Sequence, residues 1–180
     1  FNMVNAIMLR VHQSGQITQI SPDRKALVKE ALDTYKRIRP DIRRAFPFWP
    51  LGLSKYSDPW VCMGLRTDRR AYIALWRRNS EQETISLPVS FLAGRSVKAN
   101  FLYPACDPCP YCWNDGTATL SVTLEKPYSA RIFCLEFWST KNSDRREGLF
   151  NESKMNKKPY DFLSDDPKPI DFPWEFLRFG

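Results

Sequence analysis

The stretch Phe46–Leu53 divides the chain into two parts whose apolar residues follow different periods. Before it, apolar side chains recur at helical spacing; after it, as far as about residue 138, they alternate as they do in strands. Its two prolines forbid a regular helix, and its three aromatic residues are too apolar for a solvated linker. We therefore expect this stretch to pack between a helical body and a β domain, and Trp49→Ala to cost about 3 to 5 kcal/mol.

Two helices are predicted before this stretch. The first covers residues 2–11 and ends at His12–Gly15, because glycine suits the left-handed conformation that closes helices. The second begins with Ser21 as a capping residue and Pro22 at the first helical position, and it ends at Arg39-Pro40. Its predicted apolar stripe consists of Leu27, Val28, Ala31, Leu32, Tyr35 and Ile38.

Strand-like alternation predicts six strands after the stretch. Short strands at this spacing are typical of an antiparallel sandwich or barrel. We expect an α+β chain in which residues 46–138 form an antiparallel β-sandwich domain. Residues 139–180 are rich in Lys, Asn, Ser, Asp and Pro and are expected to be a largely disordered tail. The predicted strands cover residues 60–65, 71–77, 84–88, 97–103, 118–124 and 130–137.

The net charge of +7 does not by itself indicate a nucleic-acid partner. Residues 139–180 hold eight basic and eight acidic residues, so the whole excess lies in residues 1–138. Much of it falls on the second predicted helix, where a solvated face explains it. A nucleic-acid surface would need an aromatic and arginine-rich strand face. That face is offered only by Arg66, Arg69, Arg70, Arg77 and Arg78, and we predict no nucleic-acid partner.

The loop with Cys106, Cys109 and Cys112 contains two overlapping Cys-x2-Cys spacings that could hold a soft metal ion. A structural zinc site needs four ligands, and Cys62, Cys134 or the single histidine would have to complete it. We predict no metal site. A disulfide is the expectation for a secreted protein and free thiols for a reducing compartment, so the localisation stays open. His12 is expected to have a structural, hydrogen-bonded role.

Acidic pairs occur only as neighbours in predicted loops or in the tail. Solvated surface charge explains Glu81 with Glu83, Asp107 with Asp115, and Asp165 with Asp166. No phosphate-binding glycine loop or nucleophile elbow is present, so we assign no catalytic residue and leave the substrate-binding residues unknown. The chain begins without methionine or a leader and has no apolar run long enough to span a bilayer. We expect a piece of a longer protein with no membrane partner.

Four separated blocks of the sequence follow one another in this order: Phe1–Ala6, His12–Gly15, Phe48–Leu53 and Tyr72–Arg77. Together they resemble the C-terminal third of α-galactosidases of glycoside hydrolase family 36. The resemblance covers about residues 1–138. It implies a larger enzyme with an N-terminal β domain, a central (β/α)8 barrel and a C-terminal antiparallel β domain. Residues 1–45 would then be the last helices of the barrel.

The family is similar throughout in retaining hydrolysis of terminal α-galactosides by two aspartates, without metal or organic cofactor. Both aspartates would lie upstream, so the resemblance implies an α-galactoside partner for the whole enzyme and no activity for this chain alone. The alternative is a non-catalytic carbohydrate-binding β-sandwich module that stacks sugar rings on Trp60, Trp76 and Trp113. A homo-oligomer is kept as an open option.

Overall fold

The computed structural model describes residues 1–12 and 17–139. It contains two α-helices, α1 (Asn2–Met8) and α2 (Pro22–Ile42), with the short 3-10 helix η1 (Ile17–Gln19) between them. The predicted tail covers residues 139–180. Its first residue, Ser139, ends strand β8 (Ser129–Ser139), and the rest of it lies outside the described residues, as does Gly15. The helices and both sheets belong to one compact unit. The division at residue 45 into barrel helices and a β domain therefore stays a prediction about a longer protein.

Helix α2 does not end at Arg39-Pro40 as predicted, because it continues to Ile42 with Pro40 inside its last turn. So close to the C-terminus, a proline removes one backbone donor and interrupts little of the helix. Side-chain contacts of the next residue, Asp41, hold this turn against the sheet. Ser21 occupies the N-cap position but makes no side-chain capping bond.

In the part of the chain that the structure describes, eight strands form two sheets, with every neighbouring pair antiparallel. The large sheet has the order β1-β2-β3-β8-β5, and the small sheet has the order β4-β7-β6. The 3-10 helix η2 (Ser90–Leu92) connects β4 to β5. The strands are β1 (Phe46–Phe48), β2 (Trp60–Arg66), β3 (Arg70–Arg77), β4 (Thr84–Pro88), β5 (Arg95–Tyr103), β6 (Tyr111–Asn114), β7 (Thr119–Thr123) and β8 (Ser129–Ser139).

The first hydrophobic core lies between the two sheets, as the predicted sandwich requires. Strand β7 shows the predicted alternation: Leu120 and Val122 are fully buried, while its hydroxyl residues lie on the outer face. This polar face carries cross-strand bonds such as that between the Thr84 and Thr123 hydroxyls, 2.8 Å apart. The small sheet therefore has one buried and one wet face. The large sheet contributes Ile73, Leu75, Phe133, Leu135 and Phe137, among others.

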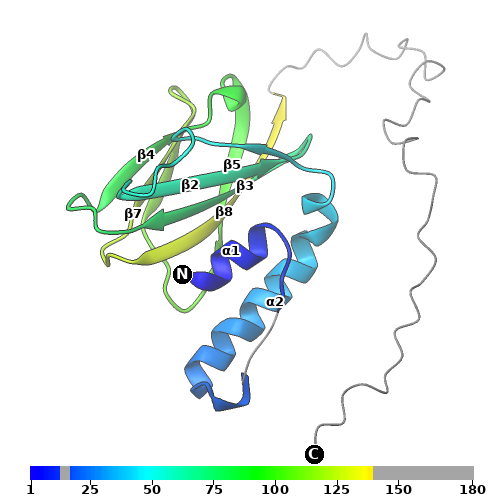
Figure 1. The fold of residues 1–180 in the computed structure, drawn as a ribbon. Coiled ribbons are helices and arrows are strands. Elements are labelled where there is room, and N and C mark those ends of the chain that lie inside the picture. Colours follow the sequence, from blue (N-terminus) through cyan, green and yellow to red (C-terminus); the bar gives the residue numbers. More distant parts are fainter. Residues whose placement is uncertain (13–16, 140–180) are drawn as a thin grey trace, which may run out of the picture. The chain divides into compact units, whose positions relative to one another are not determined.

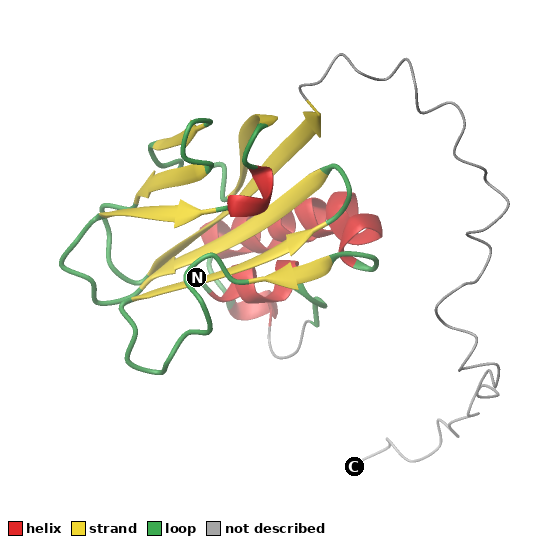
Figure 2. Cartoon of the chain, turned by 90° about the horizontal axis from the view of Figure 1, so that it is seen from above, coloured by secondary structure: helices red, strands yellow, loops and turns green. Residues whose placement is uncertain are grey.

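The second hydrophobic core lies on the opposite face of the large sheet, where both helices pack (Figures 1 and 2). Val4, Ile7 and Met8 of α1 are almost fully buried there, and α2 contributes Ala31 and Ile38. The arrangement is three layers: helices, large sheet and small sheet. The sheet side of this core consists of Leu65, Tyr72, Ala74, Trp76, Tyr103, Ala130, Ile132 and Cys134.

The stretch Phe46–Leu53 is not the buried wedge that its composition predicts. It begins with an edge strand, β1, where Pro47 costs little because an edge residue needs no second ladder partner. Phe46 is 69% exposed and Trp49 is 44% exposed. Only Phe48 packs against the core, so the large stability loss expected for Trp49→Ala is wrong for this structure.

The alternation of apolar residues did not predict strands β1 and β6. Strand β1 is too short to show an alternation, and it carries a proline. Strand β6 begins at Tyr111, inside the stretch that the cysteine spacing marks as a loop. It completes the small sheet by pairing with β7.

Gly64 and Phe48 offer a test of how β1 is held. The two residues face each other across the β1–β2 ladder, and a Cβ atom added at Gly64 would overlap the Phe48 ring. Gly64→Ala should therefore lower the free energy of unfolding by about 1 to 3 kcal/mol, the usual cost of overpacking. Urea denaturation of the purified chain measures this change.

A double-mutant cycle separates the clash from the backbone effect of alanine. With Phe48→Ala already present, Gly64→Ala should become neutral or slightly stabilising, because the overlapping ring is gone and alanine restricts the unfolded chain. Trp49→Ala is the matched aromatic control and should stay within about 1 kcal/mol of wild type. Equal costs for Gly64→Ala in both backgrounds would contradict the packing of Phe48 on Gly64.

Candidate functional site

Three cavities adjoin the turn between β2 and β3, and Asp68 at the tip of this turn lines all of them. We name them the Trp138 cavity (about 480 Å³), the Asp41 cavity (about 520 Å³) and the Phe91 cavity (about 340 Å³). Together they form an arginine-rich cleft. It is lined by Asp41, Arg44, Phe46, Arg66, Thr67, Asp68, Arg69, Arg70, Phe91, Arg95, Glu136, Phe137, Trp138 and Ser139.

The turn itself is fixed by Thr67. Its backbone N–H donates to the Arg70 carbonyl at 2.7 Å, and its hydroxyl accepts from the Arg70 N–H at 3.1 Å. A threonine hydroxyl commonly replaces a backbone acceptor in this way. The turn therefore holds Asp68 and Arg69 outward at the end of the hairpin.

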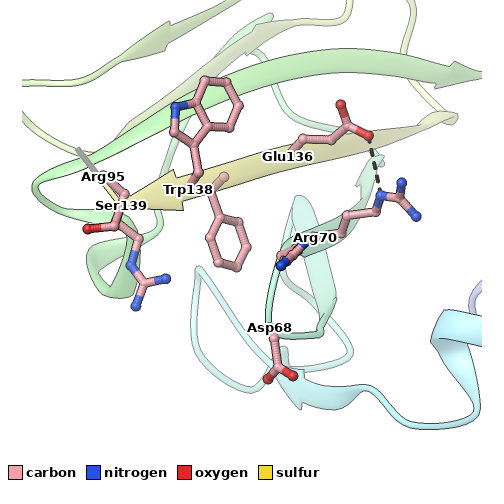
Figure 3. A pocket seen from close by; sticks show the side chains of 8 residues that line it. Asp68, Arg70, Arg95, Glu136, Trp138 and Ser139 are labelled. Carbon is pink, nitrogen blue, oxygen red and sulfur yellow. Dashed lines mark hydrogen bonds and ion pairs between the residues drawn. The ribbon is translucent and has the colours of Figure 1, made fainter. Parts of the chain in front are cut away.

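Asp41 is the most highly bonded side chain of the cleft, although only 7% of the residue is exposed. Its carboxylate accepts from the Tyr72 hydroxyl at 2.6 Å, from Arg44 Nη2 at 2.8 Å and from Arg70 Nη1 at 3.1 Å. Arg70 also donates from Nε to Glu136 at 3.3 Å (Figure 3). This Asp41 network ties the end of α2 to β3 and β8.

The network changes the acid–base behaviour of its members. Burial raises the pKa of Asp41, but the hydrogen bonds from Tyr72, Arg44 and Arg70 outweigh it, so the net pKa lies below the usual value. Burial and the bond to Asp41 raise the pKa of Tyr72. A carboxylate held ionised by three donors suits a structural anchor better than a general acid.

Trp138 and Arg95 border the other side of the Trp138 cavity, where β8 and β5 pair at their ends (Figure 3). Trp138 is an exposed aromatic residue beside this cavity. From the sequence, Trp138 is the last residue of the predicted β domain, and nothing marks it as part of a cleft.

Unlike the exposed arginines of the cleft, Arg77 and Arg131 are buried, and both stabilise the fold. The Arg77 guanidinium donates to the carbonyls of Leu124, Glu125 and Ser80, which fixes the loop between β7 and β8. Arg131 donates to Asp107 at 2.6 Å and to the Ala130 carbonyl. The five arginines singled out for a nucleic-acid face therefore do not share one surface. Arg77 is buried, and Arg78 lies beyond the opposite end of β3 from the turn.

All five cysteines are free thiols. Cys106 and Cys112 are exposed, while Cys109 is half-buried, and its burial raises the pKa of its thiol despite the nearby Arg131. Burial also raises the pKa of Cys134 to about 12. Among residues 1–12 and 17–139, no group of three or more His, Cys, Asp and Glu side chains is placed to hold a metal ion.

None of the sequence-predicted acidic pairs forms a catalytic arrangement in the described residues. Glu81 and Glu83 lie on an exposed loop. Asp107 pairs with Arg131, and Asp115 accepts from the indole N–H of Trp113 at 2.7 Å. Asp165 and Asp166 lie outside the described residues. Retaining glycosidases need two carboxyl groups about 5 to 5.5 Å apart across the scissile bond. Because Asp165 and Asp166 are not described, the assignment of no catalytic residue stays a prediction.

The single histidine and two of the tryptophans considered for sugar stacking differ in how far they are buried. His12 is exposed, which contradicts the structural role expected from its place beside a buried helix. Trp60 and Trp76 lie in the two cores and cannot stack on a sugar ring. No helix in the described part of the chain is long and apolar enough to cross a membrane.

Comparison with known proteins assigns no family to this chain. No family model matches the chain, and no curated protein matches it. A solved structure that resembles it is the galactosidase domain of an alpha-galactosidase-sucrose kinase, AgaSK, at a TM-score of 0.46 and 13% identity. The match covers 67% of this chain and 17% of that one. At this TM-score the likeness carries no argument, and this chain spans less than a fifth of that structure.

The structure defines the class: an antiparallel, sandwich-like β domain with two helices on the outer face of its larger sheet. The arginine-rich cleft opens at the end of its first hairpin.

Asp41→Asn tests the network that supports the cleft. The substitution removes the anion that Arg44 and Arg70 share. We expect a loss of about 1 to 2 kcal/mol, because the Arg44 and Arg70 side chains are 73% and 49% exposed and water solvates them once the anion is gone. Because the folded-state pKa of Asp41 lies below its unfolded value, this contribution is complete above about pH 4 and shrinks at lower pH. Denaturant titrations of both proteins between neutral and acidic pH measure the difference.

Asp33→Asn is the control, because Asp33 pairs with Lys29 on the exposed side of the same helix at 3.7 Å. It should cost no more than about 0.5 kcal/mol at any pH. A difference between wild type and Asp41→Asn that grew as the pH fell would contradict the ionised anchor.

Proposed function

We propose that this chain is the C-terminal part of a retaining α-galactosidase that hydrolyses terminal non-reducing α-D-galactosyl residues of oligosaccharides. The observation that carries the proposal is the resemblance of four ordered sequence blocks to glycoside hydrolase family 36. Three of the blocks fall at defined places in the fold: at α1, at β1 and the turn after it, and in β3. The chain itself has a structural role, and the catalytic aspartates belong to the part of the enzyme before Phe1.

A second apolar stripe on α2 supports this role. Leu27, Ala31 and Ile38 pack on the large sheet, which uses one flank of the helix. Val28, Leu32 and Tyr35 follow the spacing of a neighbouring flank, are only half-buried, and do not belong to either core. A helix that only covered a sheet would need one apolar stripe. The second stripe suits a helix that also packs against the rest of the barrel, which the proposal places before Phe1.

The carbohydrate-binding alternative is not favoured by the positions of its tryptophans. Two of the three are core residues, and the indole N–H of Trp113 is engaged by Asp115. Under the proposal, the α-galactoside binds in the upstream barrel, and neither metal nor organic cofactor is required.

Activity measurements on two lengths of the protein test the proposal. The 180-residue chain should not hydrolyse an aryl α-galactoside, because retaining hydrolysis needs two positioned carboxyl groups and the proposal assigns both of them to the upstream barrel. The same chain extended by the sequence that precedes Phe1 in its gene should hydrolyse it. Hydrolysis by the short chain, or an upstream sequence without a barrel pattern, would contradict the proposal.

The second stripe gives the same comparison a structural readout. Leu32→Ser should lower the melting temperature of the short chain less than that of the extended protein, because this side chain is only partly buried there and belongs to neither core. Ile38→Ser is the matched control and should destabilise both proteins, since Ile38 is buried against the sheet. An equal effect of Leu32→Ser in both lengths would show that nothing upstream covers the stripe.

A further inference from the structure

Arg66 and Arg95 are fixed in the cleft without a carboxylate partner. The Arg66 guanidinium carbon lies 4.9 Å from the centre of the Phe91 ring, and that of Arg95 lies 5.2 Å from the centre of the Phe137 ring. Neither arginine forms an ion pair with any residue in the described part of the chain. Stacking over an aromatic ring positions a guanidinium while leaving the N–H donors at its edge available.

The aromatic platform beneath these arginines is part of the core. Phe91 contacts Phe137 edge to face at 6.2 Å and contacts Phe48 at 5.1 Å. Phe137 is buried, and Phe48 and Phe91 pack against the core between the sheets. The two stacked arginines therefore lie over a packed aromatic support, while both residues are exposed to solvent.

Both arginines line the Phe91 cavity, whose volume of about 340 Å³ lies within the range of small-ligand sites. They enter it from different strands, Arg66 from the end of β2 and Arg95 from the start of β5. Among the neighbouring cations, Arg70 contacts Asp41 and Glu136, and Arg44 contacts Asp41. Arg69 lines the other two cavities and not this one. The acidic residue that lines this cavity is Asp68.

We propose that the Phe91 cavity is a binding site for a doubly charged oxyanion, which is free phosphate, free sulfate or the phosphate monoester of a sugar. Two guanidinium groups from separate strands match the charge and the several acceptor oxygens of such a group. The cavity leaves room for a sugar ring beside the anion, next to the exposed Phe46 side chain. This proposal does not rest on the α-galactosidase assignment, since it concerns only residues of this chain.

Isothermal titration calorimetry of the 180-residue chain at low ionic strength tests the site, with inorganic phosphate, sulfate, acetate and a hexose 6-phosphate as probes. Phosphate and sulfate should bind with a Kd on the order of 1 mM, and acetate more weakly because it carries one charge. Tighter binding of the hexose phosphate than of phosphate would identify a sugar ester as the ligand, and equal binding would identify the free anion.

Variants on each side of the cavity assign the binding to these residues. Arg66→Gln and Arg95→Gln should each weaken phosphate binding about tenfold or more, the loss expected for a hydrogen bond between charged groups. Asp68→Asn should strengthen it about two- to fivefold by removing a repelling charge from the cavity. Arg78→Gln is the matched control, because Arg78 also stacks over an aromatic ring, that of Tyr56 at 5.9 Å, and does not line the cavity.

Thermal unfolding of each variant establishes that it is folded before it is titrated. If an arginine variant does not fold, Asp68→Asn still decides, since it alters only an exposed residue of the turn. No binding of phosphate or sulfate by the wild-type chain would overturn the proposal. Equal affinity for acetate, or unchanged phosphate affinity in Asp68→Asn and both arginine variants, would overturn it as well.

Discussion

Strand β3 is buried on both faces, and the other layers are arranged to meet that requirement. Ala71, Ile73 and Leu75 face the core between the sheets, whereas Tyr72, Ala74 and Trp76 face the helices. An antiparallel sheet commonly leaves one face to water, but this strand carries apolar residues on both faces at every position from Ala71 to Trp76. The small sheet covers one face and α1 and α2 the other. The helices are thus part of the stability of the β domain, whatever precedes them in the chain.

Sequence periodicity predicted the parts of this fold that a single local rule decides. The six predicted strands are present, with ends that shift by no more than two residues, because burial imposes alternation along each of them. Helix α2 was predicted at its start but not at its end. There, Asp41 makes contacts with β3 that outweigh the proline before it. The short strand β1 was missed because its pairing depends on Phe48 filling the space above Gly64, which no local pattern shows.

The cleft could be predicted only in part. The arginines between Arg66 and Arg70 are visible in the sequence, but they were considered there only as part of a nucleic-acid-binding face. Its organisation depends on residues far away in the chain: Asp41 lies 29 positions before Arg70, and Glu136 lies 66 after it. Sequence alone treats all of these arginines alike. Only the antiparallel pairing of β3 with β8 brings Glu136 opposite Arg70.

The way each arginine is held separates structural from available charge. Arg70 donates its N–H groups to Asp41 and Glu136, and Arg77 donates to backbone carbonyls. Neither can bind another group without breaking hydrogen bonds that stabilise the fold. A guanidinium that stacks on a ring is held by its face, and its edge stays free for an acceptor. Arg66 and Arg95 are held in this second way, at the end of the hairpin where the three cavities of the cleft adjoin. The Asp41 network therefore does more than join α2 to the sheet. It pairs Arg44 and Arg70 with carboxylates, so the charges that line the Phe91 cavity are those of the stacked pair and of Asp68.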